Sequence, residues 1–194
     1  MSEPLPAAFF ERDVVDVARE LIGATLEFGG CAGRVVEAEA YDESEPACHA
    51  FAGITDRTWP LFGSPRHAYV YLSYGIHELF NVVTGPEGHG AAVLIRALEP
   101  IAGIERMRVR RPGRSDRELC SGPGRLTLAF GIGLAHNALP LDGSPAAPVL
   151  TRGAGAADVV SGPRIGITKA AELPWRFCER DSGWISGRAP AADR

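Results

Sequence analysis

Residues 35–41 read V-V-E-A-E-A-Y, and this stretch organises the interpretation of the whole chain. Its apolar and polar side chains alternate, which is the period of a half-buried β-strand. The small apolar positions predict the side that faces the core: Val36, Ala38 and Ala40. The opposite side carries Val35, then two carboxylates and a phenol: Glu37, Glu39 and Tyr41. Like charges on one side of a strand repel each other, so this side is either exposed surface or the lining of a site that needs a carboxylate.

Composition limits the classes of protein that the chain can represent. Its length of 194 residues suits one domain, which we expect to span residues 1–194 with flexible ends at 1–8 and 188–194. The net charge of −4 disfavours a nucleic-acid partner on average. The basic residues are unevenly placed, however, because only Lys169 is a lysine and six arginines fall between Arg106 and Arg117. The average therefore hides a local concentration of positive charge.

The cysteines and the N-terminal sequence indicate a cytoplasmic protein with reduced thiols. The four cysteines are far apart and form no C-x-x-C pair: Cys31, Cys48, Cys120 and Cys178. The first ten residues contain two prolines and a glutamate, unlike a secretory signal, and no apolar run reaches the length of a membrane span. We therefore expect no membrane partner.

Periodicity predicts a single α+β domain with a curved, mostly antiparallel β-sheet, flanking helices and a protruding β-hairpin. Asp13 caps a helix whose apolar spacing ends at Gly23. Strands are predicted at residues 25–28, 35–41, 69–73, 76–84, 91–98, 149–151 and 164–168. Further helices are predicted at residues 100–107 and 123–130, and residues 1–11 and 108–117 are expected to be loosely held. The short connections between residues 69 and 98 predict an antiparallel meander.

Residues 42–65 form a long irregular connection, which in a compact domain is usually functional or disordered. It contains His49, for which a hydrogen-bonded loop histidine is the simpler interpretation. The five histidines show no metal-ligand spacing, and the sequence patterns of zinc deaminases, α/β-hydrolases, P-loop proteins and dinucleotide-binding proteins are absent. We therefore expect no metal and no cofactor.

Three tyrosines cluster around the predicted hairpin. Tyr69 and Tyr71 share one side of a strand, where core packing is the simpler interpretation. Tyr74 is different because the Tyr74-Gly75 pair falls at the turn, where a side chain has little to pack on. An exposed aromatic ring on a rigid hairpin is suited to stacking on DNA bases or wedging between them.

Arg96 is the single charge in the apolar run A-A-V-L-I-R-A-L. A charge inside an apolar strand requires a partner, and a carboxylate of residues 35–41 is the obvious candidate. Two interpretations remain equally open: a structural ion pair, or a guanidinium that helps to hold a reacting nucleophile.

Six motifs, in order along the chain, resemble the 3-methyladenine (alkyladenine) DNA glycosylase family. They are V-V-E-A-E-A-Y at 35–41, C-H-A-F at 48–51, A-Y-V-Y-L-S-Y-G-I-H-E-L-F-N-V-V at 68–83, V-L-I-R-A-L-E-P at 93–100, E-L-C-S-G-P-G-R-L at 118–126 and R-I-G-I-T-K-A-A-E-L-P-W-R-F at 164–177. The resemblance runs from about Phe9 to Gly187. It implies a monofunctional base-excision repair enzyme, without abasic-site lyase activity, that flips a damaged purine out of double-stranded DNA and hydrolyses its N-glycosidic bond with water.

The resemblance also implies roles for individual residues. Glu39 would be the general base that activates the water, positioned with the help of Arg96 and the main-chain carbonyl of Ile165. The stacking pocket for the flipped base would be built from Tyr41, His49 and Tyr71. Asn81 would guard the pocket floor against the 2-amino group of guanine. The contacts to DNA would come from Tyr74 as a wedge, and from Gly75 and Arg57.

Physical chemistry favours this assignment independently. Alkylation of a ring nitrogen makes a purine cationic and a better leaving group, and an electron-rich aromatic cage prefers a cationic ring. A carboxylate near the sugar would stabilise an oxocarbenium-like transition state. The only lysine, Lys169, lies far along the chain from Glu39, so water rather than an amine is the expected nucleophile. Alkylated purines such as 3-methyladenine are the expected substrates, with hypoxanthine and ethenoadenine as further candidates.

Two other classes remain open on the sequence. A nucleoside hydrolase acting on free small molecules would need Glu39 but not an exposed Tyr74. A non-catalytic module that binds damaged DNA would need Tyr74 but not Glu39. For a DNA-binding enzyme, Arg57, Arg66 and residues 106–117 are expected to supply a local basic face. We expect a monomer, because the active face must stay open to a duplex.

Overall fold

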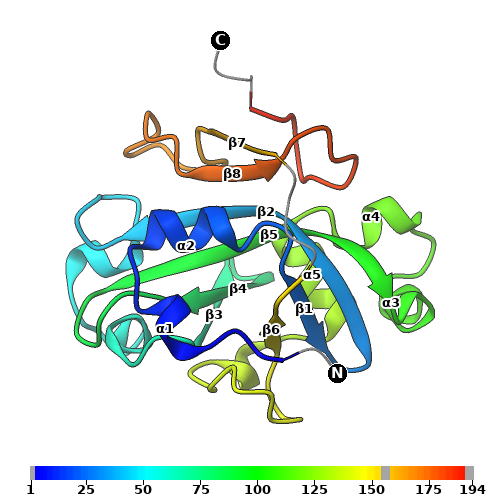
Figure 1. Ribbon diagram of the computed structural model, residues 1–194, viewed down its shortest axis with the longest axis horizontal. Coiled ribbons are helices and arrows are strands. Elements are labelled where there is room, and N and C mark those ends of the chain that lie inside the picture. The colour runs from blue at the N-terminus through cyan, green and yellow to red at the C-terminus, as the bar shows by residue number, and fades with distance from the viewer. Residues whose placement is uncertain (1–2, 154–157, 191–194) are drawn as a thin grey trace.

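A curved antiparallel sheet of eight strands forms the centre of the computed structural model, which describes residues 3–153 and 158–190 (Figure 1). The strand order along the sheet is β3 (Ala68–Ser73), β4 (His77–Val83), β5 (Ala91–Ala102), β2 (Cys31–Asp42), β1 (Thr25–Phe28) and β6 (Val149–Thr151). The remaining strands extend from β2: β8 (Arg176–Glu179) pairs with β2, and β7 (Val159–Gly162) pairs with β8. The predicted α+β class and the predicted β3–β4–β5 meander are confirmed.

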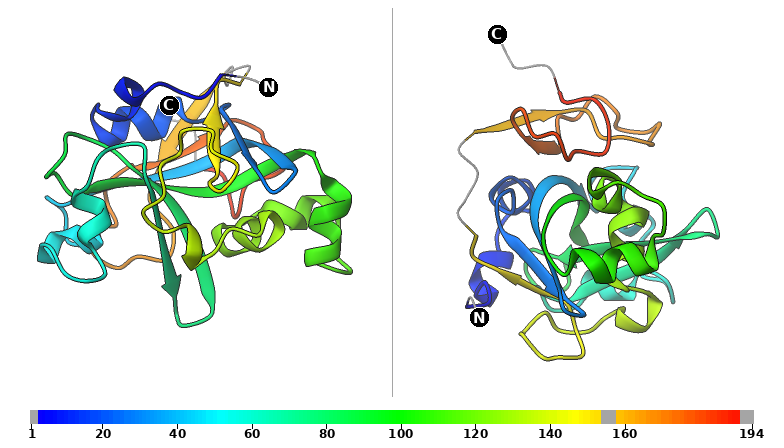
Figure 2. Two further views of the ribbon diagram at one scale, coloured as in Figure 1. Left: turned by 90° about the horizontal axis from the view of Figure 1, so that it is seen from below. Right: turned by 90° about the vertical axis from the view of Figure 1, so that its right-hand side faces the viewer.

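Short helices cover the sheet. They are α1 (Ala7–Phe10), α2 (Val14–Glu20), α3 (Ile104–Arg110), α4 (Asp116–Cys120) and α5 (Pro123–Phe130). Asp13 caps α2 as predicted, because its Oδ1 accepts a hydrogen bond from the Val15 N–H at 2.8 Å. The β3–β4 hairpin projects from the side of the molecule opposite to α1 and α2 (Figure 2, left). The β3–β4 hairpin and helices α1 and α2 therefore lie on opposite sides of the protein (Figure 2).

The ladder between β2 and β5 is interrupted near Glu37. The register shifts on either side of this residue, so that Val36 on β2 and Arg96 on β5 have no partner residue. Val35 consequently packs in the main core, whereas Val36 packs in a separate cluster beneath β7 and β8. The predicted alternation is wrong for these two valines and right for residues 37–41.

The predicted strand at residues 164–168 is wrong. These residues form an irregular loop in which Gly166 adopts a φ of 80°, a conformation that interrupts a strand. The N–H of Ile165 in this loop turns toward β2 and donates to Glu39. The regular pairing lies on either side of the loop, in β7 and β8, neither of which was predicted.

The predicted helix at residues 100–107 also needs correction. β5 continues to Ala102, and the helix begins only at Ile104, after Gly103 with a φ of 75°. A side chain at Gly103 would clash with the carbonyl oxygen of Gly30, so the tight approach of the two segments requires glycine. Residues 108–117, expected to be loosely held, contribute to α3 and α4.

The N-terminal segment is docked rather than loose. The Leu5 N–H donates to the Leu150 carbonyl, and the side chains of Leu5 and Phe10 are buried. At the other end, the Arg188 carbonyl accepts a hydrogen bond from Arg176, and residues 191–194 of the predicted flexible tail lie outside the described residues. In the part of the chain that the structure describes, no helix has the length and apolar character needed to cross a membrane.

Candidate active site

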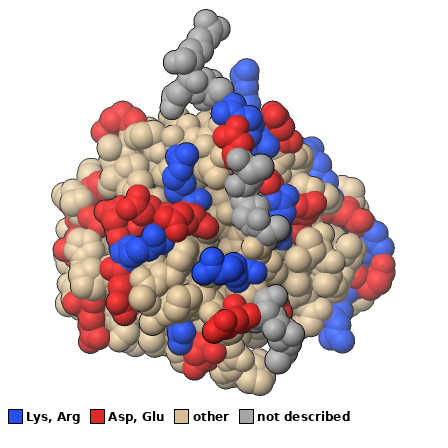
Figure 3. Space-filling model, viewed as in Figure 1, with Lys and Arg blue, Asp and Glu red and all other residues tan. Residues whose placement is uncertain are grey.

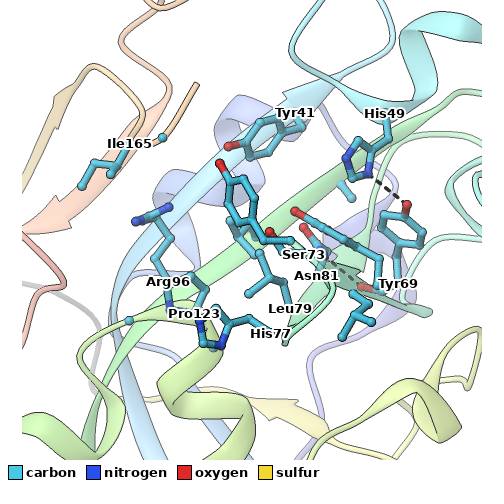
Figure 4. A pocket seen from close by; sticks show the side chains of 18 of the residues that line it. Tyr41, His49, Tyr69, Ser73, His77, Leu79, Asn81, Arg96, Pro123 and Ile165 are labelled. Carbon is cyan, nitrogen blue, oxygen red and sulfur yellow. Dashed lines mark hydrogen bonds between the residues drawn. The ribbon is translucent and has the colours of Figure 1, made fainter. Parts of the chain in front are cut away.

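A cavity of about 700 Å³ lies between the sheet, the 3-10 segment His49–Ala52, the start of α5 and the loop at Ile165 (Figure 4). A row of paired residues crosses the sheet beside it. Tyr69 of β3 pairs with Asn81 of β4, Asn81 pairs with Leu94 of β5, and Leu94 pairs with Glu39 of β2. Paired residues of antiparallel strands place their side chains on the same side of the sheet. The topology therefore brings residues from four strands to one surface.

The carboxylate of Glu39 accepts three hydrogen bonds. Its Oε1 accepts one from the Ile165 N–H at 2.7 Å. Its Oε2 accepts one from the Tyr41 hydroxyl at 2.8 Å and one from Arg96 at 3.1 Å. Glu39 has no exposed surface, but all three donor residues line the cavity. The structure thus brings these four predicted residues together, with the Ile165 N–H rather than its carbonyl oxygen on the carboxylate.

Glu37 lies in a closed ionic cluster. Its Oε1 accepts from Arg176 at 2.7 Å and from Arg96 at 3.2 Å, and its Oε2 accepts from the Ser186 N–H at 2.6 Å. Arg96 therefore bridges Glu37 and Glu39 from the interrupted part of the β5 ladder. Both interpretations of Arg96 that the sequence left open are compatible with this position.

The two carboxylates have opposite pKa shifts. Burial raises the pKa of Glu39 above its usual range, although Arg96 and the Ile165 N–H oppose this effect. Burial acts on Glu37 in the same direction, but Arg96 and Arg176 together outweigh it, so the pKa of Glu37 is lowered. Glu39 is therefore the more basic of the two side chains.

One wall of the cavity is formed by Tyr41, which is supported from behind by Arg164. The Arg164 guanidinium lies 4.6 Å from the centroid of the Tyr41 ring and 5.4 Å from that of Trp175. It is fully buried and donates to Glu45 at 2.6 Å and to the Ala40 carbonyl at 2.8 Å. Burial and the nearby Glu39 raise the pKa of Tyr41, so its hydroxyl stays protonated and can donate.

Another part of the cavity lining is formed by His49 and Tyr71, whose ring centroids are 4.6 Å apart. His49 Nδ1 lies 3.0 Å from the Tyr69 hydroxyl, and Asn81 Nδ2 donates to the Tyr69 carbonyl at 3.0 Å (Figure 4). Burial lowers the pKa of His49 to about 4, with a further contribution from Arg57, so the imidazole is neutral near pH 7. Burial raises the pKa of Tyr71 to about 12. The predicted pocket residues are therefore gathered around one space as uncharged side chains.

The hairpin tip carries Tyr74, and its predicted exposure is confirmed. Its side chain is 88% exposed, and both Tyr74 and Gly75 have positive φ angles, of 51° and 72°. The Ile76 N–H donates to the Ser73 carbonyl at 3.1 Å, which closes the turn. A tyrosine held in this conformation costs on the order of 1 kcal/mol, and such strain is concentrated at functional positions.

The basic residues are distributed differently from the expectation. Arg57 is exposed at the edge of the cavity, and its guanidinium lies over Tyr71 at 5.2 Å from the ring centroid. Within residues 106–117, Arg108 pairs with Glu105 and Asp116. From this stretch only Arg111 lines the cavity, and Arg66 does not line it.

On the face viewed in Figure 3, acidic and basic side chains intermingle. This face bears α2 and lies opposite the hairpin. Positive charge at the cavity comes instead from arginines that line it: Arg57, Arg96, Arg111 and Arg125.

Within residues 3–153 and 158–190, no group of three or more His, Cys, Asp or Glu side chains could hold a metal ion. The four cysteines are buried and free, and burial raises the pKa of Cys48 to about 12.

Sequence reasoning missed two arginines that organise the site. Arg176 neutralises Glu37, and Arg164 supports Tyr41. A signal for Arg176 was present, because W-R-F-C at residues 175–178 places one charge in an apolar run, as at Arg96. Arg164 follows Gly162-Pro163 and gave no comparable signal.

Comparison with known proteins shows the family of the chain. The family model described as methylpurine-DNA glycosylase (MPG) matches residues 8–183. A protein of Nitrobacter winogradskyi named putative 3-methyladenine DNA glycosylase is 55% identical over 186 residues, covering 96% of this chain and 88% of that protein. A protein of Rhodopseudomonas palustris with the same name is 54% identical over 182 residues, covering 94% of this chain and 87% of that protein. The chain therefore belongs to the methylpurine-DNA glycosylase family.

Proposed function

We propose that the protein is a monofunctional DNA glycosylase that flips alkylated purines out of duplex DNA and hydrolyses the N-glycosidic bond with water activated by Glu39. The observation that most supports this proposal is the position of Glu39. It is a carboxylate of raised pKa, one residue layer behind an aromatic-lined cavity, and it is held by donors that themselves line the cavity. A buried carboxylate with this environment suits general-base catalysis.

In this proposal the water contacts Oε1 of Glu39. Oε1 has a single donor, the Ile165 N–H, whereas Oε2 has two. Glu39 accepts a proton from the water as the water oxygen bonds to the sugar C1′. The electrons of the N-glycosidic bond leave with the purine. The Ile165 carbonyl would accept a hydrogen bond from the second O–H of the water, which stays on the sugar as the C1′ hydroxyl, and Arg96 would keep the carboxylate ionised and oriented.

The flipped base would stack between the two walls of the cavity. Tyr41 would contact one ring face, and His49 with Tyr71 the other; the presence of all three rings in the lining of one cavity supports this arrangement. Asn81 is fixed at the floor by its hydrogen bond to Tyr69 and would exclude purines with a 2-amino group. Alkylated purines such as 3-methyladenine are the primary substrates in this proposal, and hypoxanthine and ethenoadenine are further candidates.

Tyr74 would enter the duplex as a wedge when the base leaves the stack. Its exposed position on a closed turn with Gly75 supports this role, since the ring need not be freed from other contacts. A nucleoside hydrolase acting on free substrates gains nothing from such a residue. We propose that the protein acts on DNA as a monomer, with the hairpin side facing the duplex.

Hydrolysis without strand cleavage follows from the amines available to the site. Lys169 is the single lysine of the chain, and it is exposed and does not line the cavity. No lysine lines the cavity to form a Schiff base with the sugar, so we expect the abasic product to remain intact.

The proposal is tested by measuring base release from a panel of duplexes and matching single strands, each with one defined lesion. We expect release of 3-methyladenine from the duplex, with an intact abasic strand until alkali is added. Tyr74→Ala should weaken duplex binding and slow release, whereas Tyr74→Phe should retain both. Release from free nucleosides but not from DNA would support a nucleoside hydrolase. Tight duplex binding with no release of any base would support a binding module.

A further inference from the structure

The side chain of Arg57 lies on the aromatic wall of the cavity. Its Cζ is 5.2 Å from the Tyr71 ring centroid, and its Nη2 is 3.3 Å from His49 Nε2. A guanidinium can only donate, so His49 Nε2 is the acceptor and Nδ1 carries the proton that points to Tyr69. The protein's own planar cation thus occupies part of the wall on which a flipped purine would stack.

The backbone that carries Arg57 is fixed, and its side chain is not. Thr55 and Thr58 hydrogen-bond to each other across the turn, and Thr58 Oγ1 donates to the Gly53 carbonyl at 2.9 Å. The guanidinium forms no ion pair with any carboxylate of the described residues. The guanidinium of Arg57 can therefore move off the Tyr71 ring. Because its backbone is fixed, the charge stays near the mouth of the cavity.

The other arginines around the cavity differ from Arg57 in their contacts. Arg96 is paired with Glu37 and Glu39, and Arg164 is paired with Glu45. Arg111 and Arg125 also line the cavity, and they hydrogen-bond to main-chain carbonyls and to Ser121. Arg57 differs from them because its guanidinium, which has no ion pair within the described residues, lies on the aromatic wall itself. A cationic purine entering the cavity meets this like charge, whereas a neutral purine does not.

We propose that Arg57 is a specificity-determining residue that lowers the preference of the cavity for cationic purines relative to neutral ones. This inference rests on the proposed function and adds a charge-dependent component to its substrate choice. An aromatic wall alone would favour the cationic ring. In the free protein the Arg57 guanidinium makes the cation–π contact with this wall, and its charge repels a cationic purine that approaches the same wall.

The test compares Arg57→Ala with the native protein in single-turnover release of 3-methyladenine, which is cationic in DNA, and of hypoxanthine, which is neutral; neither base has a 2-amino group. We expect the ratio of the two rate constants to shift about threefold to tenfold toward the cationic base. Arg57→Lys keeps the charge and should keep most of the native ratio. Arg152→Ala removes an exposed arginine that does not line the cavity and should leave the ratio unchanged. Equal losses on both substrates, or an unchanged ratio for Arg57→Ala, would overturn the proposal.

A second measurement does not require any glycosylase activity. N-methylquinolinium and 2-methylquinoline are a cationic and a neutral bicyclic ring of similar size, and their binding to the DNA-free protein can be followed by tyrosine fluorescence. Arg57→Ala should improve binding of the cation relative to the neutral ring by a similar factor. If this shift occurs while no base is released from any duplex, the proposed function fails and the role of Arg57 stands. If base is released and neither ratio shifts, the role of Arg57 fails alone.

Discussion

Glu37 and Glu39 are two residues apart on one side of β2, and neither has exposed surface, yet their surroundings are opposite. Glu37 is enclosed by two guanidiniums and a main-chain N–H, and its pKa is lowered. Glu39 shares only Arg96 and lies directly behind the cavity, and its pKa is raised. Burial acts on both in the same direction, so the different signs come from the surrounding groups: Arg96, Arg176 and Ser186 lower the pKa of Glu37, whereas burial outweighs Arg96 and the hydrogen bonds at Glu39. The same strand thereby supplies one structural carboxylate and one basic carboxylate.

Of the replacements that test this difference, that of Glu39 should have the largest effect on base release. Glu39→Gln keeps the size of the side chain and removes the base, so single-turnover base release should fall by about 10²- to 10⁴-fold. Duplex binding should remain within a few-fold of the native value, because Tyr74 and the stacking residues are untouched. Base release from an alkylated duplex at the native rate would exclude Glu39 as the general base.

The sequence predicts only part of this difference between Glu37 and Glu39. Strand alternation correctly put both carboxylates on one side, and the apolar run around Arg96 correctly required a carboxylate partner. Alternation could not separate Glu37 from Glu39, because their difference comes from Arg176 on β8, more than a hundred residues away, and from a ladder irregularity at Val36.

The C-terminal region shows the same limit. Residues 164–168 have the composition of a strand but form the loop that holds Glu39, because the Ile165 N–H bonds to a side chain instead of a neighbouring strand. Local pattern predicts elements whose hydrogen bonds are local or regular, as in α5 and the β3–β4 hairpin. Local pattern fails where a main-chain N–H donates to a buried side chain instead of to a neighbouring strand, as at Ile165.

Replacement of Glu37 tests the structural half of the comparison. Glu37→Gln leaves Arg176 without a carboxylate partner among the described residues, and breaking such a buried pair costs about 3 kcal/mol. The free energy of unfolding, measured with urea, should fall by about that amount. Base release by the folded variant should stay within about tenfold of native. A stable Glu37→Gln protein that has lost activity as completely as Glu39→Gln would show that the two carboxylates act together.

The pH dependence of base release measures the difference between the two pKa values. Glu39 must be ionised to accept a proton, and its pKa is raised above the ordinary value of 4.5. The rate should therefore fall as pH decreases through a value above 4.5, whereas Glu37, with its lowered pKa, stays ionised there. The charge of Glu37 itself raises the pKa of Glu39. The acid limb of Glu37→Gln should accordingly lie at lower pH than that of the native protein, and a shift to higher pH would contradict this coupling.

Removal of the Tyr41 hydroxyl should have the smallest effect. Tyr41→Phe deletes one of the three donors to Glu39 and keeps the ring that stacks on Arg164. Two donors to the carboxylate remain, and the lost hydrogen bond is made before as well as during the reaction, so release should slow by about tenfold or less. Because the hydroxyl lowers the pKa of Glu39, the acid limb should move to higher pH, opposite to the shift in Glu37→Gln. Tyr41→Ala also removes the stacking ring and should slow release further. If Tyr41→Phe and Tyr41→Ala were equally slow, with no shift of the acid limb in Tyr41→Phe, the hydroxyl would not act through Glu39.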